Sequence, residues 1–198
     1  MIINPQTIKI VLASTSPYRK ELLKRLGIKF TTASPKINED HIQGEKIDEY
    51  VKRLSKSKVL NIINDHEKSI IIGSDQALVC DEKILGKPGN YENAKIQLDF
   101  MNNKTVSFYT GLYVVNTETK TSKVDVIQYD VEFRKLTNLE INNYLIREKP
   151  YDCAGSFKSE KLGISLLKSM HGDDVTALIG LPLIRLSELL RDEGVSIP

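Results

Sequence analysis

The sequence predicts an α/β protein built on a mixed β-sheet, and three features of its 198 residues point to that class. Short apolar runs alternate with longer segments in which apolar residues recur every three to four positions, which is typical of strands and helices packed together. Two long strand-like segments in the middle of the chain, joined by NTETKT, favour an antiparallel hairpin. No stretch has the composition of a linker, so we expect one domain over residues 1–198.

The first half of the chain contains three predicted strands and two predicted helices. Ser16 is a favourable N-cap and Pro17 a favourable first helical residue, because proline has a helical φ and the N–H that it lacks would have no partner there. Apolar residues at helical spacing indicate a second helix. The expected elements are strands at 8–13, 30–33 and 69–80, helices at 17–26 (closed by Gly27) and 47–63, and a polar loop at 34–44.

The second half begins after a glycine- and proline-rich turn, LGKPG. Asn90 can cap the helix that follows this turn. Thr137 is followed three residues later by Glu140, which is the spacing of a capping box. The expected elements are strands at 105–115 and 123–134 and helices at 90–101, 137–147 and 182–192.

Composition limits the possible partners. The chain is 40% hydrophobic and 27% charged, as in a globular protein, and its net charge of +2 is too small for a general nucleic-acid or membrane surface. We therefore expect neither polymeric nucleic acid nor a membrane as partner. The start of the chain, MIINPQTIKIVLA, has no basic segment before its apolar run, so we expect no signal peptide. The chain has only two cysteines, Cys80 and Cys153. Together with the expected lack of a signal peptide, this number favours a cytoplasmic protein with reduced thiols.

The start of the first helix carries the wrong charges for a helix N-terminus. Its first turn contains Tyr18, Arg19 and Lys20, although each cation costs about 0.3–1 kcal/mol beside the positive end of the helix dipole. An anion at this end would remove that cost, and the hydroxyl of Ser14 would add a donor. The segment therefore predicts a phosphate site, and the alternative is a capped helix with solvated basic residues.

Asp75 lies in the middle of an otherwise apolar run, IIIGSDQALV. Burying an unpaired carboxylate is costly, so we expect this residue to face a cleft, to pair with a cation or to hold a metal ion. Such a carboxylate can bind Mg²⁺ and can position or deprotonate water. The alternative is a hydrogen-bonded bulge after Gly73.

Lys87, in LGKPG, can present a point charge to a phosphate, although Gly-Lys-Pro is also an ordinary turn sequence. The chain contains neither a Walker A pattern nor Gly-x-Gly-x-x-Gly, which excludes a P-loop protein and a standard Rossmann protein.

Six motifs in a fixed order resemble the Maf family of nucleotide pyrophosphatases: LASTSPYRKELL, IIGSDQ, LGKP, FYTGL, CAGSFKSE and LIGLPL. They extend from about residue 8 to residue 194, which is nearly the whole chain. GSDQ and CAGSFKSEKLG resemble the subgroup that hydrolyses 7-methyl-GTP, whereas other subgroups prefer dTTP and UTP.

This resemblance implies a fold and a reaction. The fold would be an elongated mixed sheet flanked by helices, with two lobes around a deep cleft, related to inosine triphosphate pyrophosphatase. The reaction would use a divalent metal ion, Mg²⁺ or alternatively Mn²⁺, to cleave a nucleotide between its α and β phosphates. The products would be a monophosphate and pyrophosphate. The family is also compatible with a homodimer.

The resemblance also assigns roles to individual positions. Asp75 matches the catalytic proton acceptor, and Glu39 matches an acidic residue that assists Asp75 in binding the metal ion. The remaining matches are the phosphate-contacting positions Ser14, Arg19, Lys58 and Lys87 and the base-specificity positions Tyr18, Gln76 and Glu160.

Two positions depart from the family pattern. Tyr18 stands where the 7-methyl-GTP subgroup often has Trp, and Asn38 replaces an Asp commonly found before Glu39. Two alternatives to a 7-methyl-GTP pyrophosphatase therefore stay open. One is a pyrophosphatase for dTTP, UTP or another modified nucleotide, and the other is a non-catalytic nucleotide-binding regulator of cell division.

Overall fold

The computed structural model describes residues 8–198. Residues 1–7, on which the signal-peptide expectation largely depends, lie outside this range. The described chain divides into two compact units. Unit 1 comprises the residues up to Gln76, Thr110–Ile127 and Gly180–Pro198, and unit 2 comprises Ala77–Tyr109 and Gln128–Ile179.

The fold is a mixed sheet with helices, as the sequence predicts. The strand order is β2-β1-β3-β5-β6-β7, with β4 paired to β3. β1 is parallel to both β2 and β3, whereas β3–β4 and β6–β7 are antiparallel. In chain order the elements are β1 (Lys9–Ala13), α1 (Pro17–Lys24), β2 (Thr31–Ala33), α2 (Ile47–Ile62), η1 (Ile63–Asp65), β3 (Ser69–Cys80), β4 (Lys83–Leu85), α3 (Tyr91–Met101), β5 (Thr105–Asn116), β6 (Thr121–Phe133), α4 (Asn138–Glu148), η2 (Ala154–Ser156), η3 (Leu162–Leu166), β7 (Leu167–His171), α5 (Val175–Ile179) and α6 (Leu183–Asp192).

The helix starts follow their capping residues. The side chain of Ser16 accepts a hydrogen bond from the backbone N–H of Arg19 at 3.4 Å, which confirms it as the N-cap of α1. Asn90 caps α3 in the same way, and the capping box of Thr137 and Glu140 is complete at α4. α1 ends at Lys24 instead of residue 26.

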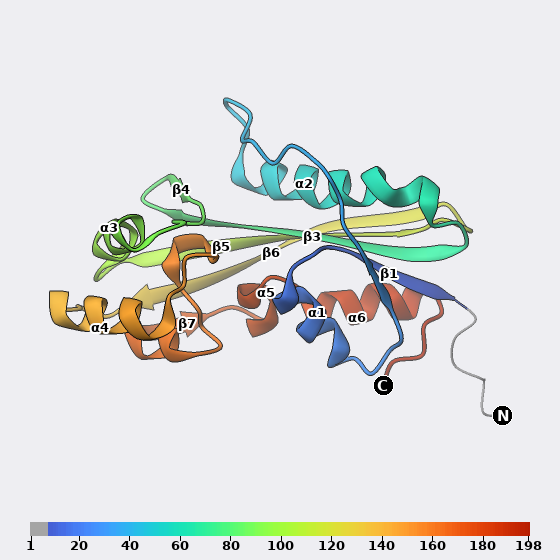
Figure 1. Cartoon of the computed structure of the whole chain (residues 1–198). Helices are drawn as coiled ribbons and strands as arrows, with labels where there is room; N and C mark the ends of the chain where they lie inside the picture. The colour runs from blue at the N-terminus through green and yellow to red at the C-terminus, as the bar shows by residue number, and fades with distance from the viewer. Residues whose placement is uncertain (1–7) are drawn as a thin grey trace. The chain divides into compact units, whose positions relative to one another are not determined.

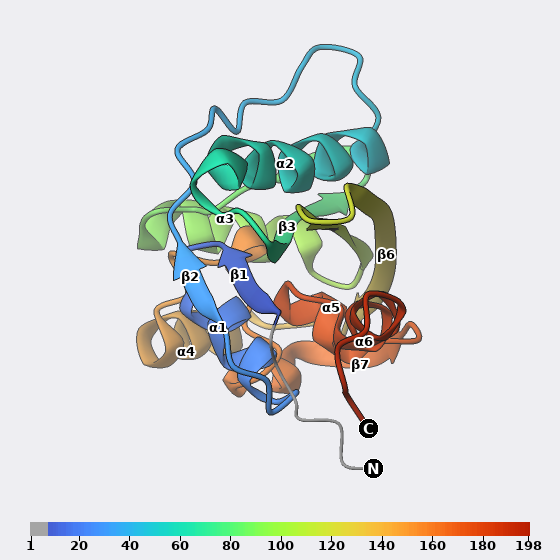
Figure 2. The same ribbon diagram turned by 90° about the vertical axis from the view of Figure 1, so that its right-hand side faces the viewer.

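In unit 1, helices cover both faces of a parallel core. α2 lies on one face of β1, and α1 and α6 lie on the other (Figures 1 and 2). Two glycines allow α2 to lie against the sheet. A Cβ on Gly73 of β3 would overlap the carbonyl oxygen of Ser55, and one on Gly111 of β5 would overlap that of Val51. The apolar contacts include Val11, Ala13, Val59, Ile62, Ile71, Tyr113 and Val115.

In unit 2, α3 and α4 pack on each other around a larger apolar core. This unit contains two strands that the sequence analysis does not predict, β4 and β7. Each is short and pairs with one long strand, so each depends on its neighbour more than on its own pattern. The largest fully buried side chains of this core are Phe133, Leu78, Leu98 and Met101.

Two further observations bear on the expected environment. Within residues 8–198, no helix has the length and apolar character needed to cross a membrane. Cys80 is a buried free thiol, and Cys153 is a half-buried one.

Candidate active site

Asp75 lies on β3 just past the point where the neighbouring strand β1 ends. The paired register runs from Lys9 beside Ser69 to Leu12 beside Ile72, and β1 stops at Ala13 while β3 continues to Cys80. β3 is one continuous strand here, so the polar residues do not break it. In open α/β sheets, ligands bind at the carboxyl ends of the strands, at the point where the strand order reverses. Here that point is at β1, which lies between β2 and β3 in the sheet.

Asp75 is buried and paired with a cation, one of the three environments that its sequence predicts. Its carboxylate accepts a hydrogen bond from the ammonium group of Lys58. Lys58 belongs to the apolar face of α2, one turn after Leu54, and its side chain is only 8% exposed. The pair is therefore held between α2 and β3 inside unit 1, where removal of either charge would leave the other without compensation.

Glu39 brings a second carboxylate to the same ammonium group. Its Oε1 lies 2.8 Å from Nζ of Lys58, although the Glu39 side chain is 56% exposed. Glu39 belongs to the segment between β2 and α2, residues 34–46, which we call the Glu39 loop. The structure thus brings Glu39, Lys58 and Asp75 together from a loop, a helix and a strand.

Arg19 lies within electrostatic range of these carboxylates. Burial lowers the pKa of its guanidinium, and the negative charges of Asp75 and Glu39 oppose that shift. Arg19 Nε donates to the carbonyl oxygen of Gly180 at 2.8 Å, and the hydroxyl of Ser74 donates to the same oxygen at 2.9 Å. Gly180 has a φ of +117°, a backbone conformation that favours glycine. Its carbonyl therefore orients Arg19 from a distant part of the chain.

Three further predicted residues lie in unit 1. Ser14 is buried directly after β1, and its hydroxyl accepts a hydrogen bond from the N–H of Ser16 at 3.1 Å, which stabilises the turn before α1. Tyr18 is half-buried in the first turn of that helix. Gln76 follows Asp75 on β3, and its Nε2 donates to the hydroxyl of Thr110 at 3.1 Å.

Unit 2 brings together two of the six motifs, LGKP and CAGSFKSE. In the turn before α3, which carries the exposed Lys87, the carbonyl of Gly86 accepts from the N–H of Gly155 at 3.3 Å. The N–H of Gly89 donates to the carbonyl of Tyr151 at 3.0 Å. LGKPG therefore lies against the beginning of CAGSFKSE, although more than 60 residues separate Gly86 from Gly155.

Glu160 lies in a turn closed by a hydrogen bond from the N–H of Lys161 to the carbonyl of Lys158, and its side chain is exposed. Lys158 itself is buried. Its Nζ lies 3.4 Å from Asp152, and its N–H donates to the hydroxyl of Tyr144 at 3.1 Å. The sequence analysis does not identify Lys158, because a lysine in a polar stretch gives no sign that it will be buried.

Comparisons with known proteins identify the family. A model of the family described as "Maf-like protein" matches residues 9–193, from β1 to the end of α6. The chain belongs to the Maf family. The resemblance drawn from the six motifs is therefore confirmed.

Several curated Maf relatives are similar over nearly their whole length. The 7-methyl-GTP pyrophosphatase of Pseudomonas fluorescens is 47% identical over 191 residues, covering 96% of this chain and 100% of the relative. The proteins of the same name from Pseudomonas aeruginosa and Idiomarina loihiensis are 48% identical, and each alignment covers 96% of this chain and 98% or 97% of the relative. A solved structure, the Ham1 protein of Staphylococcus aureus, aligns over 63% of this chain and 71% of its own at 14% identity, with a TM-score of 0.44, which is too low to establish a shared fold.

The carboxylates of this Maf chain fit a divalent ion of the magnesium type. Mg²⁺ in nucleotide sites is usually held by one or two carboxylates together with substrate phosphates and water, and Asp75 and Glu39 meet at Lys58 as such a pair. Residues 8–198 contain no group of three or more acidic, histidine or cysteine side chains arranged for a metal ion, so the protein alone forms no complete cage.

Sequence analysis misses two residues that orient this site, Ser74 and Gly180. Both act through the Gly180 carbonyl, which receives the hydrogen bonds of Ser74 and Arg19. The glycine lies in LIGLPL, one of the six motifs, which is the signal that could have found it. That its carbonyl meets Arg19, 161 positions away, can be read only from the folded chain.

Proposed function

We propose that this protein is a nucleoside triphosphate pyrophosphatase that hydrolyses 7-methyl-GTP to 7-methyl-GMP and pyrophosphate. The observation that carries the proposal is the 47–48% identity to proteins of that name over 96% of the chain. The buried Lys58–Asp75 pair, with Glu39 and Arg19 beside it, supports the reaction, because phosphoryl chemistry depends on positioned charges.

In the proposed reaction, a water oxygen forms a bond to the α-phosphorus while the bond from that phosphorus to the α–β bridging oxygen breaks. Pyrophosphate leaves with the electron pair of the broken bond, and the proton of the water passes to the carboxylate of Asp75. Lys58 holds this carboxylate in place through its hydrogen bond. Arg19 and Lys58 offset the negative charge on the phosphates, and Ser14 stabilises the turn that presents Arg19.

We propose Mg²⁺ as cofactor, held by Asp75 and Glu39, with Mn²⁺ as an alternative ion. When bound, it supplies positive charge to the phosphate oxygens and shields the two carboxylates from the anionic substrate. Lys87, on the turn before α3, is a further proposed phosphate contact.

Base selection has a separate physical basis. Methylation at N7 makes guanine cationic, which favours stacking on the electron-rich ring of Tyr18. Glu160 can accept hydrogen bonds from N1 and N2 of guanine, and its negative charge favours a cationic base. Gln76 supplies one further donor or acceptor beside Asp75. The two free thiols and a nucleotide substrate are consistent with a cytoplasmic site of action.

A pyrophosphate-release assay with Mg²⁺ across 7-methyl-GTP, GTP, dTTP, UTP and ATP tests the proposal. We expect the highest kcat/KM for 7-methyl-GTP. We also expect Asp75→Asn to lose about 10³-fold in kcat. The variant should still fold cooperatively, but with lower stability, because the buried Lys58 loses its main counter-charge. Asp125→Asn, which alters an exposed carboxylate paired with Arg185, is the matched control and should retain turnover within about twofold.

Other outcomes separate the alternatives. Preferred hydrolysis of dTTP or UTP would replace the substrate and leave the enzyme class intact. Binding of 7-methyl-GTP by calorimetry without turnover of any nucleotide would support a regulator. Turnover by Asp75→Asn at the wild-type rate would remove Asp75 from the proposed role.

A further inference from the structure

The Glu39 loop places an exposed carboxylate against the buried ammonium group of Lys58. This contact requires other interactions that hold the loop in place. Residues 34–46 contain no helix or strand, and surface segments of this kind are ordinarily mobile. Even so, Glu39 Oε1 lies 2.8 Å from the ammonium group of Lys58. An exposed side chain on an unrestrained loop would lose conformational entropy on each such contact.

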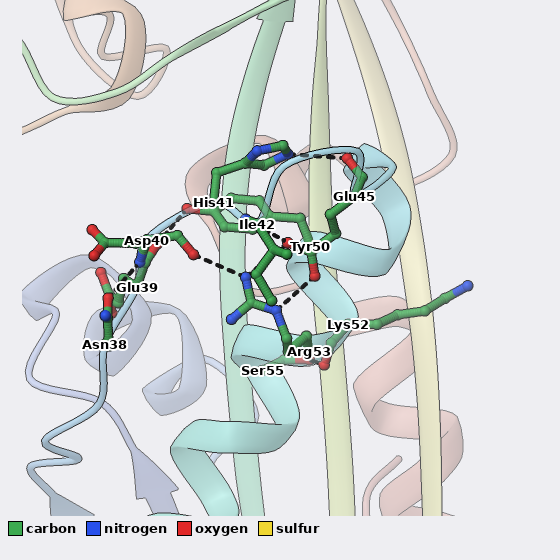
Figure 3. Close-up of polar contacts among 10 residues, drawn as sticks. All are labelled: Asn38, Glu39, Asp40, His41, Ile42, Glu45, Tyr50, Lys52, Arg53 and Ser55. Carbon is green, nitrogen blue, oxygen red and sulfur yellow. Dashed lines mark hydrogen bonds and ion pairs between the residues drawn. The ribbon is translucent and has the colours of Figure 1, made fainter.

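Arg53 fastens the loop to α2 at two points. Its guanidinium forms a two-pronged ion pair with Glu45, with Nε 2.6 Å from Oε1 and Nη2 2.8 Å from Oε2. Nη2 also donates to the carbonyl oxygen of Asp40 at 3.0 Å (Figure 3). The fork of an arginine can make these contacts together, whereas a lysine has a single charged nitrogen. Arg53 lies on α2 five positions before Lys58.

Tyr50 holds the main chain at Glu39 itself. Its hydroxyl donates to the carbonyl oxygen of Glu39 at 2.8 Å. Because Arg53 holds the next carbonyl, that of Asp40, two consecutive peptide units that follow Glu39 are held from a single helix. Figure 3 shows the Tyr50 and Arg53 side chains extending from α2 toward these loop residues.

Further contacts brace the two side chains. The guanidinium of Arg53 lies over the ring of Tyr50, 5.5 Å from its centroid, and the ring of His41 lies 5.2 Å from the same centroid. His41 Nε2 is 3.0 Å from the carbonyl oxygen of Glu45, and Asn38 accepts from the N–H of Asp40 at 2.7 Å. The loop is therefore held by side chains on both sides of Glu39.

The electrostatics agree with a formed ion pair. The hydrogen bond from Arg53 lowers the pKa of Glu45, and the same bond raises the pKa of Arg53.

We propose that Arg53 and Tyr50 are positioning residues for Glu39. By binding the consecutive carbonyls of Glu39 and Asp40, they hold the Glu39 carboxylate against Lys58, beside Asp75, before substrate arrives. Asn38, which stands where the family commonly has an Asp, contributes a hydrogen bond to the same loop. The catalytic part of this inference rests on the proposed function, since it takes Glu39 as a ligand of Mg²⁺, whereas the ordering of the loop does not.

The first test measures the loop without substrate or metal. Lys36 is an exposed trypsin site within the Glu39 loop. We expect Arg53→Met to accelerate limited cleavage after Lys36 about tenfold and Tyr50→Phe to accelerate it by a smaller factor. Arg185→Met is the matched control, because Arg185 also pairs with two carboxylates, Asp125 and Glu188, but lies on α6. Cleavage as slow in Arg53→Met as in Arg185→Met would overturn the proposal that Arg53 holds the Glu39 loop.

The second test asks whether Arg53 acts through Glu39. In the wild-type background, Arg53→Met should lower kcat/KM for 7-methyl-GTP about 10- to 100-fold and raise the Mg²⁺ concentration at half-maximal rate by a similar factor. In a Glu39→Gln background the same change should cost less than about twofold, because the carboxylate to be positioned is gone. Equal losses in both backgrounds would overturn the proposal.

Two more variants keep the inference testable if Arg53→Met folds poorly. Arg53→Lys retains the charge and should recover only part of the activity, because it cannot bind Glu45 and the Asp40 carbonyl with one fork. Tyr50→Phe removes a single hydroxyl and should raise the Mg²⁺ requirement about threefold. Two results together would count against the proposal: full activity of Arg53→Lys, and a Mg²⁺ requirement of Tyr50→Phe equal to that of the wild type. If no variant or wild type turns over any nucleotide, the proposed function fails, and the cleavage rates still decide whether Arg53 holds the Glu39 loop.

Discussion

Lys58 and Asp75 form an ion pair in which both side chains are almost completely buried, between α2 and β3 of unit 1. Such a pair is a weak source of net stability, because removing two charges from water costs about as much as their attraction returns. Its position on an otherwise apolar helix face supports the proposed catalytic role of Asp75.

Lys58→Met should destabilise the protein by about 3 kcal/mol, because it leaves a buried carboxylate without its main cation. Adding Asp75→Asn should restore most of that loss, since the remaining amide carries no charge. Urea unfolding of the two single variants and the double variant measures this. A double variant as unstable as Lys58→Met alone would show that packing around Lys58, and not charge, accounts for the loss.

Tyr18→Leu should lower the preference for 7-methyl-GTP over GTP about tenfold, because stacking of a cationic base on an aromatic ring contributes about 0.5–2 kcal/mol. Tyr18→Trp, which introduces the residue common in the subgroup, should retain or raise this preference. The ratio of kcat/KM values for the two nucleotides is the measurement. If leucine and tryptophan variants discriminate equally, Tyr18 does not contact the base.

Glu160→Gln should also lower discrimination between these nucleotides, by about tenfold, since an amide can still form hydrogen bonds but has lost the charge that favours a cationic base. Turnover of GTP should fall much less than turnover of 7-methyl-GTP. Parallel losses for both nucleotides would assign Glu160 to the sugar or phosphates. Asp99→Asn, an exposed carboxylate paired with Lys95 on α3 of the same unit, provides a control.

Gly73→Ala should destabilise unit 1 by about 3 kcal/mol, because the new methyl group would overlap the Ser55 carbonyl and the side chain of Val59. It would also displace α2, which carries Lys58. Gly86→Ala is the comparison, since no atom lies within 4 Å of a Cβ at that position, and it should change stability by less than about 0.5 kcal/mol. Thermal unfolding distinguishes the two, and equal stability of both variants would contradict the close approach of α2.

Glu140 predicts a specific acid sensitivity. Hydrogen bonds from the N–H and hydroxyl of Thr137, followed by the bond from Arg134, lower its pKa from 4.5 to about 2. A carboxylate with a lowered folded-state pKa stabilises the protein fully above about pH 4.5 and loses this contribution as the pH falls toward 2. The stability difference between wild type and Glu140→Gln should therefore be constant above pH 5 and shrink below it. Urea titrations from pH 7 to 2.5 measure this stability difference. A difference that does not change with pH would show that the Glu140 carboxylate is not the origin of the acid sensitivity.

Much of the fold can be predicted from local patterns. The starts of α1, α3 and α4 follow from Ser16, Asn90 and Thr137, because capping residues and apolar periodicity act within a few positions. β4 and β7 escape prediction, and neither contains a fully buried residue that would mark a core strand. They exist because β3 and β6 offer them backbone partners.

For the candidate site, too, local sequence predicts one part and the packing of distant segments decides the other. The sequence by itself determined the unusual residues, namely a carboxylate inside an apolar strand, cations in the first turn of a helix, and six motifs of the Maf family. Only the tertiary structure decided that Lys58 is the partner of Asp75, that the Gly180 carbonyl orients Arg19, and that Arg53 and Tyr50 hold Glu39. A local sequence pattern shows that a charged residue would be unfavourable at its position. The partner that offsets this unfavourable free energy comes from a segment far away in the chain and approaches it only through tertiary packing.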